Sequence, residues 1–320
     1  MKNLRNYSKK LTYGMVAVTM AFVWSCSKDD ATPAVSSTDT ANVQGESVTD
    51  SYYDESNDFS STAVGGTDAT LTGRTNGEVI VTGLEKVDER FKCAIVTVVK
   101  DLTGTPNAPV YKGTITIDFK TGCTDAKGNI RKGKIIVTYS GKRFALNSTI
   151  VTTFSDYSVN GIKIEGTNAL TNLTALVEKP LTRKFTNELT GGKVTFTDGK
   201  TATRDHTMTR EVTLAYDGSL RVPKNDSWKV LEGSLATGTN RDGLTYAMLV
   251  TKSLVYKRSC AESKVFIAVE GTKKFTSGEK VMTIDFGTGA CDNTVTVTLT
   301  VNGTVVGTPK EVEIKADGSN

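Results

Sequence analysis

The sequence predicts an all-β protein whose long antiparallel meander forms a sandwich-like or strongly curved sheet with an internal pseudo-repeat. Three observations support this fold class. The 320 residues include 50 threonines, and β-branched side chains are enriched in strands. From residue 78 onward, apolar and polar residues alternate with a period of two, which is typical of half-buried strands. Asn-Gly and Asp-Gly pairs separate the alternating runs, and such pairs are strong hairpin signals.

Residues 113–119 and 294–300 illustrate the alternation, because each segment places three apolar side chains on one face. No segment of 12 residues shows a helical stripe of apolar residues. We expect roughly 12–15 strands, and because a meander buries one face of each strand, the sheet must fold over itself or curl. Hairpin turns are expected at Asn160-Gly161, Asp198-Gly199, Asp217-Gly218, Asp242-Gly243 and Asn302-Gly303.

Residues 1–25 have the pattern of a signal peptide, with a basic start followed by a mostly apolar stretch at residues 11–25. As a helix this stretch is only about 22 Å long, against roughly 30 Å for the hydrocarbon core of a bilayer. A cleaved signal is therefore favoured over a membrane-spanning helix.

The residues around Cys26 suggest a lipid anchor. Val23-Trp24-Ser25-Cys26 resembles a bacterial lipobox, which implies that Cys26 is lipidated and becomes the mature N-terminus. Lys28-Asp29-Asp30 resembles the signal that sends lipoproteins of the Bacteroidota phylum to the outer face of the outer membrane. The alternative is an ordinary secretory signal with an incidental cysteine.

Residues 26–70 are expected to form an acidic, flexible tether. They contain nine acidic residues and one lysine, a net charge of −8, and little hydrophobic periodicity. Such a composition buries too little apolar surface to offset the entropy lost on ordering. Asp39-Thr40-Ala41 resembles an O-glycosylation site of the same phylum, so Thr40 is a candidate for this modification.

Residues 71–320 form the expected all-β body, with a net charge of +8. A basic body suggests an anionic polymer as partner, but its lysines and arginines are spread along the strands instead of forming one stripe. We therefore expect a solvated basic surface on which lysines protect strand edges, and no nucleic-acid partner.

The two copies of the pseudo-repeat cover about residues 90–170 and 257–315. The tetrapeptide at residues 116–119 recurs 167 residues later at 283–286, and Cys93-Ala94 recurs with the same offset as Cys260-Ala261. Four cysteines in an exported body allow three disulfide connectivities. Because each copy also has a cysteine in the turn after its tetrapeptide, the repeat selects the pairs Cys93–Cys123 and Cys260–Cys291.

Several stretches of the body match a known group of proteins. They lie at residues 132–141, 157–161, 237–243, 257–260, 283–289 and 291–293. These stretches resemble functionally uncharacterised surface lipoproteins of Bacteroidota, and the likeness runs across most of residues 90–300. The resemblance implies a surface location and an all-β fold, but no activity.

The single histidine restricts histidine-dependent chemistry to His206. Its neighbour Asp205 points to the opposite face of an alternating run and is a poor orienting partner for a general base. We therefore expect His206 to be an ordinary strand residue. Trp228 is the only tryptophan outside the signal, and so the only indole available as a platform for a sugar ring.

Asp118 and Asp285 have the residue type of a glycosidase carboxylate pair, but their equivalent repeat positions beside turns favour turn capping. Asp125, Asn129, Asp292 and Asn293 carry oxygens suited to Ca²⁺; however, Lys127 interrupts the first loop. The chain has no Cys-x-x-Cys pair, nucleophile elbow, zinc-binding His-Glu-x-x-His or phosphate-binding loop. We expect no catalytic residues, no metal and no other cofactor.

These observations predict a non-catalytic lipoprotein of the outer membrane, exposed on the cell surface and attached to the membrane through its lipid anchor. It is expected to be a binding or structural module whose partner is a glycan or a surface protein. The alternative is a carboxylate-dependent hydrolase that acts on polysaccharide or envelope material.

Overall fold

The computed structural model describes residues 35–320 except for the stretches 71–76, 102–103, 106–107, 110, 127, 142–144, 176–181, 219 and 316–320. The chain divides into two compact units, Met1–Thr32 and Pro33–Asn320, and the second unit contains every element described below. The expected signal peptide, Cys26, Lys28, Asp29 and Asp30 lie outside the described residues, so lipidation and export remain predictions.

Most of the described strands belong to one antiparallel sheet of 16 strands. Its order is β1-β2-β5-β7-β8-β9-β10-β11-β14-β16-β17-β18-β19-β20, with β6 beside β7 and β15 between β11 and β16, so the sheet is a meander. The hairpins β3-β4 and β12-β13 stand apart from it. The strand bounds are β1 (Glu78–Ile80), β2 (Ile95–Asp101), β3 (Gly104–Thr105), β4 (Ala108–Pro109), β5 (Lys112–Asp118), β6 (Cys123–Thr124), β7 (Ile130–Ser140), β8 (Thr149–Val159), β9 (Ile162–Asn172), β10 (Thr182–Thr195), β11 (Thr201–Thr213), β12 (Tyr216–Asp217), β13 (Leu220–Arg221), β14 (Ser227–Val230), β15 (Leu235–Thr239), β16 (Thr245–Lys257), β17 (Glu270–Ser277), β18 (Lys280–Thr288), β19 (Thr294–Val301) and β20 (Thr304–Glu313).

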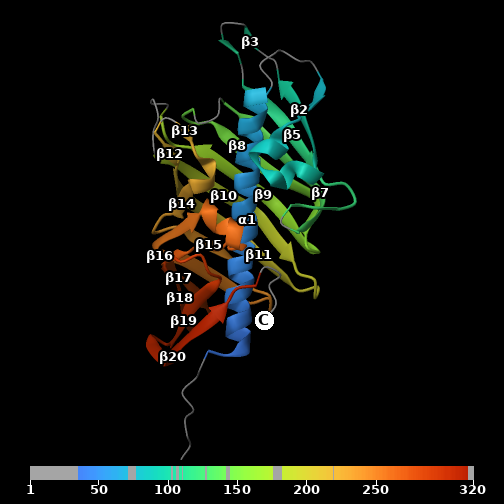
Figure 1. The fold of residues 1–320 in the computed structure, drawn as a ribbon. Helices are drawn as coiled ribbons and strands as arrows, with labels where there is room; N and C mark the ends of the chain where they lie inside the picture. The colour runs from blue at the N-terminus through green and yellow to red at the C-terminus, as the bar shows by residue number, and fades with distance from the viewer. Residues whose placement is uncertain are drawn as a thin grey trace, which may run out of the picture. The chain divides into compact units, whose positions relative to one another are not determined.

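The predicted all-β class is confirmed, and the sheet curves around a central helix (Figure 1). The alternation places side chains as expected, because Ile115 and Ile117 of β5 are buried beside the less buried threonines of the same strand. Asn160-Gly161 has a positive φ at both residues, as a type I′ hairpin turn requires.

The pseudo-repeat has a structural counterpart. Each copy begins with a 3₁₀ turn, η1 (Glu89–Cys93) or η3 (Arg258–Ser263), and continues into antiparallel strands. The structure pairs the cysteines as the repeat predicts, with Cα–Cα distances of 5.8 Å for Cys93–Cys123 and 5.1 Å for Cys260–Cys291. Each disulfide thus ties a 3₁₀ turn to the end of a strand pair.

The expected flexible tether is wrong for most of its length, because residues 37–70 form the 34-residue helix α1 (Ser37–Thr70). The start of α1 is capped reciprocally. The backbone N–H of Asp39 donates to Oγ of Ser36 at 3.1 Å, and the N–H of Ser36 donates to Oδ2 of Asp39 at 3.1 Å, which is a capping box. The compact body therefore begins well before residue 71.

α1 runs across the sheet (Figure 1), and its buried side chains belong to one hydrophobic core with residues from both ends of the sheet, such as Val96 of β2 and Val312 of β20. Phe59 of α1 packs against Phe91 and Phe119, with ring centroids 4.4 and 5.9 Å away. The short helix α2 (Leu84–Val87) packs so closely that a Cβ on Gly66 would lie 2.1 Å from Leu84. A third 3₁₀ turn, η2 (Pro223–Asn225), lies against η3. Serine, threonine, glycine and asparagine are weak helix formers, so α1 owes its stability to this enclosure.

Candidate functional site

Four acidic residues of α1 recur at every fourth position: Glu46, Asp50, Asp54 and Asp58. We call them the acidic stripe. A spacing of four places them along one side of the helix, about 6 Å apart in axial rise. Glu46, Asp50 and Asp54 are buried and Asp58 is partly buried, and a buried charge is stable only if it is paired.

Arg204 of β11 and Lys273 of β17 neutralise the first half of the acidic stripe, and both side chains are 0% exposed. Arg204 donates from Nη1 to Glu46 at 2.6 Å and from Nη2 to Asp50 at 2.8 Å. Lys273 pairs with Glu46 and lies 3.5 Å from Asp50. Burial opposes the ionisation of Asp50, but the two cations outweigh it and lower the pKa of this carboxyl.

Asp54 is less well compensated. Its Oδ1 lies 3.0 Å from Nη2 of Arg210, and both side chains are almost completely buried. Burial raises the pKa of Asp54, because Arg210 does not offset the desolvation and the charge of Asp50 adds to it. Asp54 therefore takes up a proton more readily than Asp50 and Asp58, whose pKa values are lowered.

Three arginines surround the last part of the acidic stripe. Arg90 donates to Asp58 at 2.6 Å, and Arg258 pairs with the other oxygen of the same carboxylate. Burial opposes the ionisation of Asp58, but Arg258 and Arg90 lower its pKa. Glu55, one residue from Asp54, accepts from Arg131 at 2.6 Å.

The alternation of β11 explains why basic side chains reach α1. Arg204, His206 and Arg210 are two or four residues apart and share the buried face of the strand. The expected solvated basic surface is therefore wrong for these arginines, because they are buried against the acidic helix. Other cations pair with the same helix from other elements: Arg90, Arg131, Arg258, Lys273 and Lys280.

His206 is buried beneath α1 and belongs to neither of the two large cavities described below. Nε of Arg204 lies 3.3 Å from its Nδ1, and the side-chain amide nitrogen of Asn187 lies 3.0 Å from its Nε2. Burial and the charge of Arg204 lower the pKa of His206 to about 3. It is a neutral strand residue, as expected.

Two adjoining cavities flank α1. The first has a volume of about 700 Å³ and lies between α1, η1, β16 and the segment that follows η3. The second, of about 560 Å³, lies between α1, β10 and β11. Both volumes are within the range of small-ligand sites. The two cavities share five wall residues: Asp54, Asp58, Val87, Trp228 and Arg258.

The cavity walls combine ion pairs with apolar side chains. Val87, Phe266 and Ile267 face the first cavity, while Phe185 and Leu214 face the second. A carboxylate has about four acceptor positions and a guanidinium has five donors, so each ion pair keeps hydrogen-bonding capacity for a ligand. A ligand with alternating hydroxyl and C–H surfaces matches such walls.

Trp228 lines both cavities, but other side chains of the protein pack against its ring. Its ring stacks on Tyr256 with centroids 5.4 Å apart and planes 5° apart. The guanidinium of Arg210 lies 5.9 Å from its centroid. Because these side chains pack against the indole, a ligand can contact only the apolar edge of the Trp228 ring.

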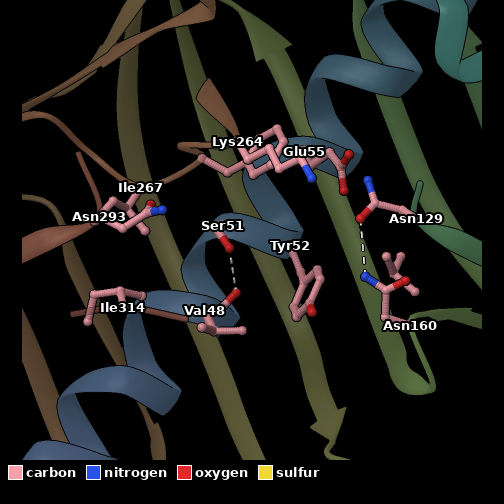
Figure 2. Close-up of a pocket in the computed structure, with 12 residues that line it drawn as sticks. Val48, Ser51, Tyr52, Glu55, Asn129, Asn160, Lys264, Ile267, Asn293 and Ile314 are labelled. Carbon is pink, nitrogen blue, oxygen red and sulfur yellow. Dashed lines mark hydrogen bonds between the residues drawn. The ribbon is translucent and has the colours of Figure 1, made fainter. Parts of the chain in front are cut away.

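A smaller pocket of about 50 Å³ (Figure 2) adjoins the first cavity and shares five wall residues with it: Ser51, Glu55, Lys264, Phe266 and Ile267. Ser51 and Tyr52 project into this region from the helix, and Oγ of Ser51 donates to the carbonyl of Val48 at 2.8 Å. The Asn160 amide donates to Asn129 at 3.1 Å. The pocket has room for only about one or two water molecules, so the two larger cavities are the candidate ligand site.

Asp118 and Asp285 lie at turns, as the repeat predicts. Oδ1 of Asp118 accepts from the backbone N–H of Lys120 at 2.7 Å, and this bond lowers the pKa of Asp118. Oδ1 of Asp285 accepts from the N–H of Gly287 at 2.8 Å. Neither residue lines the two cavities.

The candidate Ca²⁺ residues have other partners. Asp125 accepts from Nε of Arg131 at 2.9 Å and from the backbone N–H of Asn129 at 2.9 Å. Asp292 accepts from the N–H of Thr294 at 3.0 Å. Within the described part of the chain, no group of three or more His, Cys, Asp or Glu side chains is arranged to hold a metal ion.

Thr40, the candidate glycosylation site, lies in the first turn of α1. Its hydroxyl donates to the carbonyl of Ser36 at 3.0 Å and accepts from Lys310 at 3.2 Å. The neighbouring Asp39 pairs with Lys280 at 2.8 Å. The side chain is partly exposed, and its modification remains a prediction.

The acidic stripe and its cations are the residues that the sequence analysis missed. Two signals pointed to them: Ser36 and Asp39 have the spacing of a capping box, and four acids recur at every fourth position. The net charges of −8 and +8 on the two segments were a third signal, because opposite charges of equal size can pair within one chain.

Comparison with known proteins gives no relative: no protein-family model, curated protein or solved structure matches the chain. Among the described residues, none of the helices combines the length and the apolar character needed to cross a membrane.

Proposed function

We propose that this protein is a lipid-anchored binding module of the outer cell surface, and that its ligand is a glycan held in the two cavities beside α1. The anchor rests on the lipobox ending at Cys26 and on the export residues Lys28, Asp29 and Asp30. The ligand site rests on the chemistry of the cavity walls.

One observation carries the choice of a glycan. The cavities together exceed the volume of a single small molecule, and their shared wall alternates ionic groups such as Asp54 and Arg258 with apolar groups such as Val87 and Trp228. A sugar presents hydroxyls that both donate and accept hydrogen bonds, next to apolar C–H patches. Carboxylates and guanidinium groups bind the hydroxyls, and the apolar side chains cover the C–H patches.

A glycan array probed with residues 27–320 tests this proposal. These residues contain the whole compact unit, including α1, but not the anchor. We expect a defined set of glycans to bind, and titration calorimetry to give one site per chain. If no glycan binds at millimolar concentration, the proposal is wrong, and a pull-down from surface extracts then tests a protein partner.

Val87 provides a blocking variant with a matched control. Val87 lines both cavities and is 61% exposed, so Val87→Trp fills the shared opening without disturbing the core. Val305 on β20 is 60% exposed and lies outside both cavities. Val87→Trp should lose glycan binding, whereas Val305→Trp should keep it.

A second candidate function, hydrolysis of the bound glycan, is favoured by the pair Asp54 and Asp58. Both line both cavities one helical turn apart, and their surroundings raise the pKa of the first and lower the pKa of the second. Glycosidases use one protonated and one ionised carboxyl group. If new reducing ends form from a bound glycan and Asp54→Asn abolishes them while binding persists, the protein is an enzyme.

The surface location has a separate test. External protease should remove the protein from intact cells, and full protection would contradict surface exposure. Replacing Lys28, Asp29 and Asp30 with alanine should leave the lipoprotein on the inner leaflet of the outer membrane, while Cys26→Ser should release it from the membrane.

A further inference from the structure

The charges around the larger cavity are unevenly compensated. Its inner wall contains four carboxylates that form ion pairs with four arginines: Asp54 with Arg210, Glu55 with Arg131, Asp58 with Arg90 and Arg258, and Asp88 with Arg90. Because these four negative and four positive charges balance, the inner wall recognises hydrogen-bonding groups rather than net charge.

The outer wall of the same cavity carries three lysines, which we call the mouth lysines: Lys224, Lys257 and Lys264. Lys224 and Lys264 are exposed, and within the described residues none of the three has a carboxylate within 4.0 Å. Glu89 is the one acidic residue of this wall without an arginine partner in the described structure. The mouth therefore has an excess of two positive charges.

The fold holds the mouth lysines together. Lys257 ends β16, and its Nζ donates to the carbonyl of Gly289 at 2.7 Å. Lys224 lies in η2, which packs against η3, and Lys264 directly follows η3. The disulfide Cys260–Cys291 fixes η3 to the sheet, so two of the three cations are carried by elements with little freedom to move apart.

We propose that the glycan bound by this protein is acidic, a saccharide bearing uronate or sulfate groups that the mouth lysines bind while its hydroxyls contact the ion-paired inner wall. This inference rests on the proposed function and names the ligand class of the same site. A carboxylate or sulfate at the mouth gains charge-assisted hydrogen bonds from lysine, and the excess charge attracts anionic chains toward the cavity.

Two variants and two ligands test this inference with residues 27–320. Oligogalacturonate and its fully methyl-esterified form share one sugar skeleton and differ in charge, and a heparin oligosaccharide and its desulfated form make a second pair. The double variant Lys224→Glu/Lys264→Glu reverses two mouth charges. The control Lys112→Glu/Lys274→Glu makes the same charge change at exposed lysines outside the cavities.

We expect most of the glycans that bind on the array to be acidic. In at least one of the two ligand pairs, the charged saccharide should bind more tightly than its neutral form. Affinity should fall with added salt. The mouth variant should lose about tenfold in affinity, which corresponds to about 1.4 kcal/mol, because two exposed charge contacts are removed, and the control should lose little. Binding confined to neutral glycans, or equal loss in both variants, overturns the inference but leaves glycan binding intact; binding of no glycan overturns both.

Discussion

Replacing Arg204 with methionine should destabilise the protein strongly, because Arg204 is a fully buried cation that pairs with two carboxylates of the acidic stripe. Its side chain is 0% exposed and donates to Glu46 at 2.6 Å and to Asp50 at 2.8 Å. Methionine fills similar space without charge, which leaves two buried carboxylates to share Lys273. Removing one partner of a buried ion pair costs about 3–5 kcal/mol, a large part of the roughly 5–15 kcal/mol that stabilises a typical domain.

Urea unfolding of residues 27–320 at pH 7, followed by circular dichroism, measures this loss. We expect the midpoint of the Arg204→Met variant to fall by roughly 1–2 M urea. Lys200 is the control, because its pair with Asp242 is exposed at 53% and 31%, and Lys200→Met should cost less than about 1 kcal/mol. If Arg204→Met does not fold, Arg204→Lys retains the charge and should give an intermediate loss.

A change below about 1 kcal/mol for Arg204→Met would refute the ion-pair argument, because it would mean that α1 is not held in the sheet as described. Neutralising the carboxylates in the same background, with Glu46→Gln and Asp50→Asn, should recover part of the lost stability. This recovery follows because the cost comes from unpaired charge and not from lost packing volume.

Three further predictions follow from the fold. Deleting residues 37–70 should leave the remaining chain without a cooperative unfolding transition, since the helix fills the interior of the sheet; a folded deletion variant would contradict this role. The neutral native state of His206, whose pKa is lowered to about 3, should make the free energy of unfolding fall by about 1.4 kcal/mol per pH unit as pH drops below 6.5, because only the unfolded state then takes up the proton. Asp54 works in the opposite direction, since its raised pKa adds stability as pH falls, so the His206 contribution is measured as the difference in pH slope between the wild type and His206→Gln. Non-reducing peptide mapping should recover Cys93 linked to Cys123 and the matching second disulfide, and any link between the two copies would show the repeat assignment to be wrong.

The strands were predictable because their signal is local. Alternation in β5 and β11 decides which side chains turn inward, and pairs such as Asn160-Gly161 fix the hairpins through the φ values of two residues. The disulfide pairing was predictable too, because the repeat compares one part of the chain with another. In each case the physical cause lies within a few residues or within a visible internal symmetry.

The helix α1 was not predictable from composition, because its cause is not local. Serine, threonine and glycine disfavour a helix in isolation, and the stripe that faces the sheet is acidic rather than apolar, so hydrophobic periodicity does not reveal it. The candidate cavities depend on α1 and were hidden for the same reason. The inward arginines of β11 were visible in the alternation, but only the helix shows what they face.

The enclosure of α1 also determines the order in which the protein can fold. Residues 37–70 are synthesised before the strands, yet their partners lie far along the chain: Arg204 is 158 residues after Glu46, and Lys280 is 241 residues after Asp39. The segment must therefore remain an unstructured acidic chain until nearly all strands have been synthesised. Its low hydrophobicity and negative charge keep it soluble during that wait. Residues 37–70 are thus synthesised before the strands but become ordered last, and their docking completes the fold.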